Sequence, residues 1–372
     1  MKIEIIELLI EKGVDINSKN SEIKNHSPLN YVLRNQYPKE IIELLIEKGS
    51  DINSKNNQNE TPLHNALKNQ NPKEIIELLI GKGSNINYKN NQNETPLHIA
   101  LKNKYSNGII KLLISKGSNI NSKNNQNETP LHISLKNQYS KEIIELLISK
   151  GSDINSKNKW NEIPLHIALQ NNYPKEIIEL LISKGSDLNL KNYQNELPLN
   201  IAFRNKLPNE IVQLLISKKS DINTSIDGKE TPLYVALEKK YSSETIEFLI
   251  EKSIEKHPEN NQNETPLHFT LGNKLPNEIV KVLISKILDI NSKNNQNEIP
   301  LHIALKNQYS KEIIELLIEK GSDLNSKNNQ NETPLYVALK NQYSKEVIEL
   351  LIEKGDNLNS KIIKMKYLYT LL

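Results

Sequence analysis

The stretch that decides the fold is Thr129 to Glu162, which reads TPLHISLKNQYSKEIIELLISKGSDINSKNKWNE. Thr129 is an N-cap candidate, because its hydroxyl can accept a backbone N–H that has no partner inside a helix. Pro130 suits the first helical position, where the donor that it lacks would be unpaired in any case. We therefore predict a short helix from this point to the polar break at residues 137–139.

A second, longer helix is predicted in the middle of the stretch. Ile143, Leu146 and Leu147 recur at i, i+3 and i+4 and give the segment one apolar face. Gly151 can adopt the left-handed backbone that ends a helix. The segment 152–162 is too polar and too rich in turn-forming residues to be helical, so it should form an outward loop or hairpin.

The whole chain repeats this pattern. In its 372 residues the pair Pro-Leu recurs ten times at intervals of 34, at Pro28, Pro62, Pro96, Pro130, Pro164, Pro198, Pro232, Pro266, Pro300 and Pro334. Because neither helix of a unit can bury its apolar side alone, neighbouring units must stack. The sequence predicts an all-α repeat solenoid of helix-turn-helix units with protruding hairpin loops.

A period of 34 also fits tetratricopeptide arrays, but their longer helices and their Trp, Gly and Tyr pattern are missing here. Instead, TPLH with an alanine two residues later, then LL and a glycine before SDIN, resembles the ankyrin repeat family. The residues that carry the match in two units are Thr61, Pro62, Leu63, His64, Ala66, Thr95, Pro96, Leu97, His98 and Ala100. The resemblance covers essentially the whole chain.

Two features depart from the family pattern. One residue is inserted between the helices, in KNQYSKE, and the family's turn glycine before TPLH is asparagine in most units. The tyrosine of KNQYSKE alternates with leucine in other units, so it is interpreted as a packing residue. Asparagine tolerates positive φ. We expect the turn to be closed by Asn59, Asn93, Asn127 and Asn331.

The composition argues against several classes of function. The chain has 48 basic and 45 acidic side chains, a net charge of +3, which gives no strong field to attract nucleic acid or an anionic membrane. It has no cysteine, and therefore no thiolate nucleophile or sulfur-rich zinc site. No nucleophile elbow, phosphate loop or dinucleotide fingerprint is present. We expect no enzyme activity, no catalytic residue and no cofactor.

Six histidines occupy one slot of the repeat: His64, His98, His132, His166, His268 and His302. Ligands of one zinc ion lie about 2 Å from the metal, whereas equivalent atoms in stacked units should be about 10 Å apart. We therefore expect no metal site here. The family resemblance implies instead that this histidine makes structural hydrogen bonds at the start of the first helix.

The resemblance also implies that a target is held on the concave side, by hairpin tips and the short helices. Trp160 replaces the glutamine of neighbouring units at an exposed tip, and Tyr193 should lie close to it, one repeat later. Leu190, Lys157 and Lys191 belong to the same two loops. Because aromatic anchors dominate protein interfaces, we predict a partner-binding patch from these residues. The alternative is that Trp160 folds back over its own hairpin or is a neutral substitution.

Lysines recur along the short helices, at Lys68, Lys102, Lys136, Lys306 and Lys340. Such a row could attract an acidic partner. Glutamates are about as numerous, however, and no stacking aromatics alternate with the lysines. We therefore favour a solvated, solubilising row.

We expect a non-catalytic scaffold or adaptor, monomeric, that binds a protein of unknown identity but neither nucleic acid nor membrane. The alternatives are a structural spacer without a specific ligand and an effector of an intracellular microbe that acts on host proteins. No apolar run approaches the roughly 20 residues that a membrane span needs. We expect an intracellular protein of the cytoplasm, with the nucleus as the alternative compartment.

The predicted organisation has three parts: a partial repeat at 1–26, ten repeats in one array at 27–360, and a capping segment at 361–372. The helix-ending glycine is missing from three successive units, which have Lys219, Ser253 and Ile287 in its place. Losing it weakens one interface of a nearest-neighbour array. We therefore expect a softer joint at 253–260.

Overall fold

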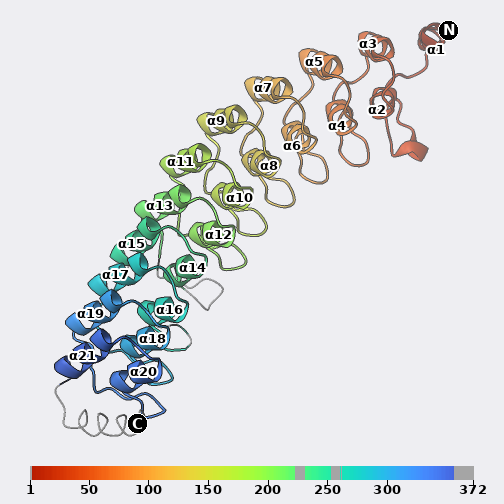
Figure 1. The fold of residues 1–372 in the computed structure, drawn as a ribbon. Coiled ribbons are helices and arrows are strands. Elements are labelled where there is room, and N and C mark those ends of the chain that lie inside the picture. Colours follow the sequence, from red (N-terminus) through yellow and green to blue (C-terminus); the bar gives the residue numbers. More distant parts are fainter. Residues whose placement is uncertain (1, 223–230, 253–259, 261, 356–372) are drawn as a thin grey trace. The chain divides into compact units, whose positions relative to one another are not determined.

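The structure is a computed structural model that describes residues 2–222, 231–252, 260 and 262–355 (Figure 1). Over these residues it contains 21 α-helices, one 3-10 helix and an isolated bridge between Asn20 and His26, but no strand. The predicted all-α repeat solenoid is thereby confirmed. The proposed joint, apart from Asn260, and the capping segment at 361–372 lie outside the described residues.

Contacts between Cα atoms divide the chain into two compact units, Met1–Leu197 and Pro198–Leu372. The elements of the first unit are α1 (Lys2–Glu11), η1 (Ser21–Ile23), α2 (Pro28–Arg34), α3 (Lys39–Glu47), α4 (Pro62–Lys68), α5 (Lys73–Gly81), α6 (Pro96–Lys102), α7 (Asn107–Ser115), α8 (Pro130–Lys136), α9 (Lys141–Ser149), α10 (Pro164–Gln170) and α11 (Lys175–Ser183).

The second unit continues the alternation of shorter and longer helices. Its described elements are α12 (Pro198–Arg204), α13 (Asn209–Ser217), α14 (Pro232–Glu238), α15 (Ser243–Lys252), α16 (Pro266–Gly272), α17 (Asn277–Lys286), α18 (Pro300–Lys306), α19 (Lys311–Glu319), α20 (Pro334–Lys340) and α21 (Lys345–Lys354).

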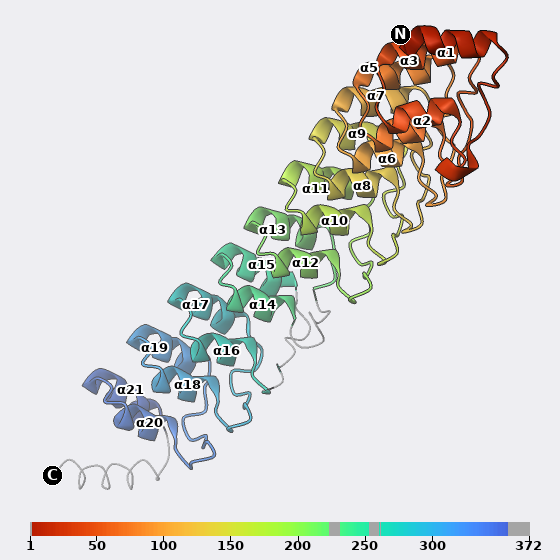
Figure 2. The same cartoon turned by 90° about the vertical axis from the view of Figure 1, so that its right-hand side faces the viewer.

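Each of these two compact units has two layers of helices. Short helices pack on the short helices of neighbouring repeats, as in α4, α6 and α8, and long helices pack on long ones, as in α5, α7 and α9. The loops that follow the long helices project beyond the layer of short helices (Figures 1 and 2). A short helix therefore has neighbours on several sides, which is why α8 is buried from Pro130 to Leu135.

The apolar face of the long helix differs in one residue from the sequence prediction. In α9 the buried side chains are Ile143, Ile144, Leu147 and Ile148, whereas Leu146 is only half-buried. The prediction was right for Ile143 and Leu147 and wrong for Leu146. Burial follows the i, i+1, i+4, i+5 pattern, because the long helix contacts its own short helix and a neighbouring long helix at once.

Left-handed backbone recurs at three places in a repeat. The helix-ending Gly151 has φ 87°, and the turn asparagine Asn127 has φ 56°. The inserted residue between the helices is left-handed too, with φ 57° at Gln138. The prediction for the turn asparagines is confirmed at Asn59, Asn93, Asn127 and Asn331, with φ from 56° to 60°.

The structure describes two of the three residues that replace the helix-ending glycine. Lys219 adopts the left-handed conformation itself, with φ 69°, although it carries a side chain. Ile287 does not: it has φ −73° and ψ 140°, so the chain leaves α17 in an extended conformation. Leu288, which follows it, is 91% exposed.

Candidate binding surface

One asparagine shapes each hairpin tip. The side-chain oxygen of Asn158 accepts hydrogen bonds from the backbone N–H groups of Trp160, at 2.8 Å, and Glu162, at 2.9 Å. Its backbone N–H donates to the carbonyl of Glu162, at 3.0 Å, and Asn161 closes the turn with φ 56°. Because Asn158 is buried, Trp160 is held at the outer end of the loop.

Successive tips are joined by backbone hydrogen bonds. The N–H of Tyr193 donates to the carbonyl of Trp160 at 2.8 Å, as that of Asn125 does to Gln92 at 2.9 Å. In the other tips side-chain amides add a second link, such as Asn93 Nδ2 to Asn125 Oδ1 at 2.6 Å. A tyrosine stands at position 193 in place of the asparagine, so an aromatic ring replaces an amide there.

The structure brings Trp160 and Tyr193 together, as the sequence predicted. Trp160 is 41% exposed and Tyr193 is 80% exposed. The ammonium of Lys136 lies 5.6 Å from the centre of the Trp160 ring. A pocket of about 380 Å³ is lined by Lys136, Trp160, Glu162, Asn192, Tyr193 and Gln194. The two rings therefore form part of one hollow rather than two separate projections.

The other three predicted site residues do not line this hollow. Lys157 and Lys191 are exposed on the two hairpins, and Leu190 is half-buried. Sequence reasoning thus found the two aromatic residues of the pocket, but not the polar residues around them.

The polar residues that it missed belong to a repeated ion pair. The lysine at the end of a short helix binds the buried or half-buried glutamate eight residues earlier. The distances are 2.6 Å for Lys68–Glu60, 2.9 Å for Lys102–Glu94 and 3.0 Å for Lys136–Glu128. The three lysine side chains are 51% to 63% exposed, in agreement with a solvated row, but each is also paired with a glutamate. The signal was present in the sequence, as a Glu and a Lys eight residues apart in five of the ten repeats.

Burial and pairing act in opposite directions on these glutamates. Burial tends to raise the pKa of Glu94, but hydrogen bonds from Lys102 and Asn90 outweigh it and hold the pKa below its ordinary value. The carboxylate is thus ionised at neutral pH. It links the end of α6 to the hairpin that precedes this helix.

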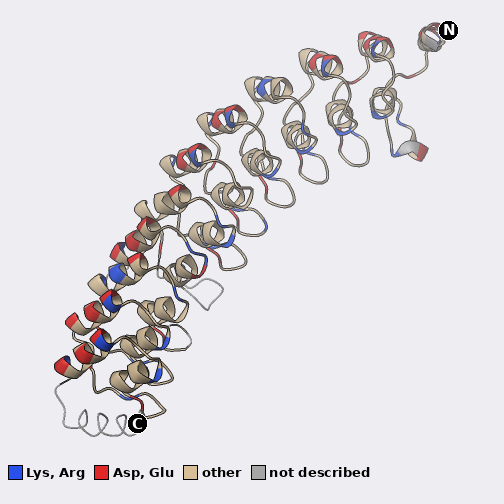
Figure 3. Cartoon of the chain, viewed as in Figure 1, with Lys and Arg blue, Asp and Glu red and all other residues tan. Residues whose placement is uncertain are grey.

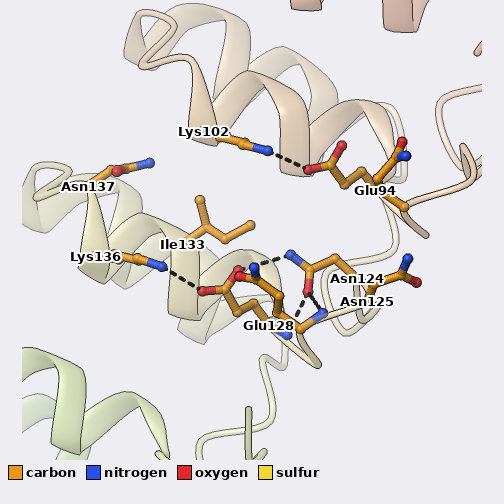
Figure 4. Close-up of a pocket in the computed structure, with 10 residues that line it drawn as sticks. Glu94, Lys102, Asn124, Asn125, Glu128, Ile133, Lys136 and Asn137 are labelled. Atoms are coloured by element: carbon orange, nitrogen blue, oxygen red, sulfur yellow. Dashed lines mark hydrogen bonds and ion pairs between the residues drawn. The ribbon is translucent and has the colours of Figure 1, made fainter. Parts of the chain in front are cut away.

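A second hollow lies next to the first and has a volume of about 390 Å³ (Figure 4). Its lining includes Lys102 and Lys136, each of which reaches its glutamate, and the apolar side chain of Ile133. Lys136 lines both hollows. The surface formed by the hairpins and short helices of the first unit is therefore indented at two adjacent places.

The histidine slot has a structural role, as the family resemblance implied. In His98 the Nδ1 atom accepts from the N–H of Thr95 at 3.2 Å and lies 2.7 Å from its hydroxyl. Nε2 then carries the proton and donates to the carbonyl of Glu128, at the end of the hairpin that follows, at 3.2 Å. Burial lowers the pKa of His98 to about 4, so the ring is neutral. The predicted cap of Thr129 likewise binds its histidine, His132, at 2.8 Å.

Charged residues of both signs are interspersed along the long helices of each unit (Figure 3). Several of them form i, i+4 pairs, such as Lys39–Glu43 at 3.1 Å. Such exposed pairs contribute little to stability. In the part of the chain that the structure describes, no helix has the length and apolarity needed to cross a membrane.

A comparison with protein families found one matching family model, described as ankyrin repeats (3 copies). It matches at residues 1–90, 69–158, 97–192, 136–226, 199–294 and 272–362. These overlapping matches together span residues 1–362. A search of curated proteins found no match.

Proposed function

We propose that this chain, which belongs to the ankyrin repeat family, is a non-catalytic scaffold that holds another protein at the tips of its middle hairpins. Ankyrin repeats are in general protein-interaction modules. The resemblance drawn from the TPLH motif is confirmed by the family match.

The observation that carries the proposal is the pairing of Trp160 with Tyr193. Two aromatic side chains, 41% and 80% exposed, share one pocket with polar residues around it. Aromatic anchors surrounded by a polar rim are the usual composition of an interface hot spot. At the positions of Trp160 and Tyr193, two repeats earlier, the chain has Gln92 and Asn125. The aromatic pair is thus a local departure from the repeat.

Lys157, Lys191 and Leu190 complete the proposed surface. The two lysines are exposed on the same two hairpins as Trp160 and Tyr193, where we expect them to supply a charged rim. Leu190 is half-buried on the hairpin of Tyr193. We therefore place the binding energy on the aromatic pair, and expect the lysines to affect the rate of association more than the lifetime of the complex.

The test is a crosslinked pull-down from an extract of the native cells. It compares the intact chain with the double variant Trp160→Ala, Tyr193→Ala. The matched control is Gln92→Ala, Asn125→Ala, which makes the same truncations two repeats earlier. All three proteins should first show similar thermal unfolding, so that loss of binding does not reflect loss of fold.

We expect a protein that is retained by the intact chain and by the control, and lost from the aromatic double variant. Equal retention by all three proteins would move the binding site elsewhere on the array. If no protein is retained by any of them, the proposal is wrong, and a structural spacer without a specific ligand is favoured.

A further inference from the structure

The pocket beside Trp160 contains a carboxylate without its usual cation. At three earlier places in Met1–Leu197, the equivalent glutamate forms an ion pair with a lysine eight residues later. Glu162 instead has Gln170 at that position. The amide of Gln170 donates to Glu162 Oε1 at 2.7 Å, and Asn158 donates to Oε2 at 2.8 Å. Within the described part of the chain, no cation forms an ion pair with Glu162.

We propose that this pocket binds a basic side chain of the partner protein, with an arginine as the best fit. The inference rests on the proposed function and assigns a chemical class to what the site recognises. The cation takes the place that a lysine of the chain itself fills in the neighbouring repeats.

The carboxylate has room for such a ligand. An ionised carboxylate offers about four acceptor positions on its two oxygens, and Gln170 and Asn158 occupy one on each oxygen. One position remains on Oε1 and one on Oε2. A guanidinium has a planar fork of N–H donors that matches this pair of oxygens.

The aromatic walls favour the same ligand. Trp160 and Tyr193 line the pocket together with Glu162. A cation that is held near an aromatic face is attracted by the ring, and an arginine can also stack its plane on it. The basic group would therefore meet a carboxylate and two rings in one hollow of about 380 Å³.

The lysines of the region do not fill this place. Lys136 lines the pocket, but its ammonium binds Glu128 at 3.0 Å, so its charge is already balanced. Lys157 and Lys191 are exposed and do not line the pocket. A half-buried carboxylate without a cation is costly, whereas exposed lysines are solvated at little cost. The pocket therefore has a carboxylate that a positive charge from outside the chain could pair with.

Two nearby substitutions create this arrangement. Compared with the preceding hairpins and short helices, the chain has a tryptophan at position 160, which supplies a wall, and a glutamine at position 170, which leaves the carboxylate open. Either change alone would give an incomplete site. Their occurrence in one hairpin and the short helix that follows it supports a common purpose.

The test uses small probes and the fluorescence of Trp160, which is the only tryptophan of the chain. The probe is the blocked tripeptide Gly-Arg-Gly. Its controls are Gly-citrulline-Gly, which has the same shape without the charge, and Gly-Glu-Gly. We expect a saturable change in fluorescence with the arginine peptide, weakened about tenfold with citrulline, the size of one lost charge-assisted hydrogen bond.

Two variants separate the carboxylate from the rings. Glu162→Gln removes the charge of the carboxylate. Gln170→Lys supplies the lysine that forms an ion pair at the equivalent place in the preceding repeats. Both should weaken the arginine peptide about tenfold. The matched control is Gln138→Lys, which adds the same charge on the turn between α8 and α9, where Lys104 stands one repeat earlier. It should leave binding unchanged.

The inference is overturned if the citrulline or glutamate peptide binds as well as the arginine peptide, if none of the peptides binds, or if Gln170→Lys binds normally. Its failure is distinguishable from that of the proposed function. A partner that is lost from the aromatic double variant but retained by Gln170→Lys would refute the basic ligand alone. An arginine peptide that binds while no protein is ever captured would refute the scaffold role alone.

Discussion

The ring of His98 is kept neutral by its burial and by its hydrogen bonds to Thr95 and Glu128. Its Nε2 proton is used on the carbonyl of Glu128, and its Nδ1 lone pair is used by Thr95. A second proton on Nδ1 would displace the N–H of Thr95 and would add a buried charge, and burial lowers the pKa to about 4 from 6.5. The unfolded chain binds this proton near pH 6.5. The stabilising effect of the neutral ring is thus complete above pH 6.5 and is lost as the pH falls towards 4.

We therefore predict that the chain loses stability between pH 7 and pH 5, by about 2 kcal/mol for His98 alone. His98→Asn should reduce this loss, because asparagine does not titrate and already stands in the same slot at Asn30 and Asn200. Urea unfolding at both pH values measures the difference. Equal pH dependence of the variant and the original chain would contradict this account. The range from pH 7 to pH 5 lies above the pKa of Glu94, which is held below its ordinary value, so this carboxylate stays ionised throughout.

The inserted residue between the helices carries a conformational cost. Gln138 is exposed and has φ 57°, a region that side chains with a Cβ disfavour. We predict that Gln138→Gly stabilises the chain by about 1 kcal/mol, and that the β-branched variant Gln138→Val destabilises it. Thermal unfolding of both variants checks the signs. A loss of stability in the glycine variant would show that the side chain makes a favourable contact.

At the scale of elements, the inter-helix tyrosine links one repeat to the previous one. The hydroxyl of Tyr139 donates to the carbonyl of Tyr105 at 3.1 Å and lies 3.3 Å from that of Ala100. The side chain is 9% exposed, and burial raises its pKa to about 12, so the donor proton is retained at any ordinary pH. The contact joins the turn before α9 to the end of α6 and the turn that follows it.

We predict that Tyr139→Phe destabilises the chain by about 1 kcal/mol, the usual net value of one internal hydrogen bond. Tyr193→Phe is the matched control and should leave stability unchanged, because the Tyr193 side chain is 80% exposed. Urea denaturation of the two variants is sufficient. If both variants behave like the original chain, the tyrosine stabilises the interface by packing alone.

The positions of the elements could be predicted from sequence because local rules set them. Proline fixed the start of each short helix, and the constant spacing of 34 placed Trp160 beside Tyr193. The hydroxyl partners of Tyr139 and the pairing of Lys136 with Glu128 could not be predicted in this way. These contacts join loops to helices or one repeat to another, so they depend on the path of the loop and the offset between stacked helices.

At the scale of the whole molecule, a repeat array is stabilised by contacts between neighbours, so a weaker interface need not be compensated elsewhere. The three glycine replacements all lie in Pro198–Leu372. Lys219 adopts left-handed backbone at a cost that glycine avoids, and Ile287 leaves its helix without that conformation. The softer joint that we propose at 253–260 falls between them. We therefore place the less stable repeats in this second unit.

Trp160 allows this to be tested, because it reports on Met1–Leu197 alone, whereas circular dichroism reports on all helices. We predict that in urea the helical signal begins to fall at a lower concentration than the Trp160 fluorescence changes. Lys219→Gly should stabilise the second unit by about 1 kcal/mol and bring the two transitions closer. Coincident transitions in the original chain would mean that the array unfolds as one cooperative body. The local cost at Lys219 would then be shared by every repeat, and the glycine variant should shift both signals equally.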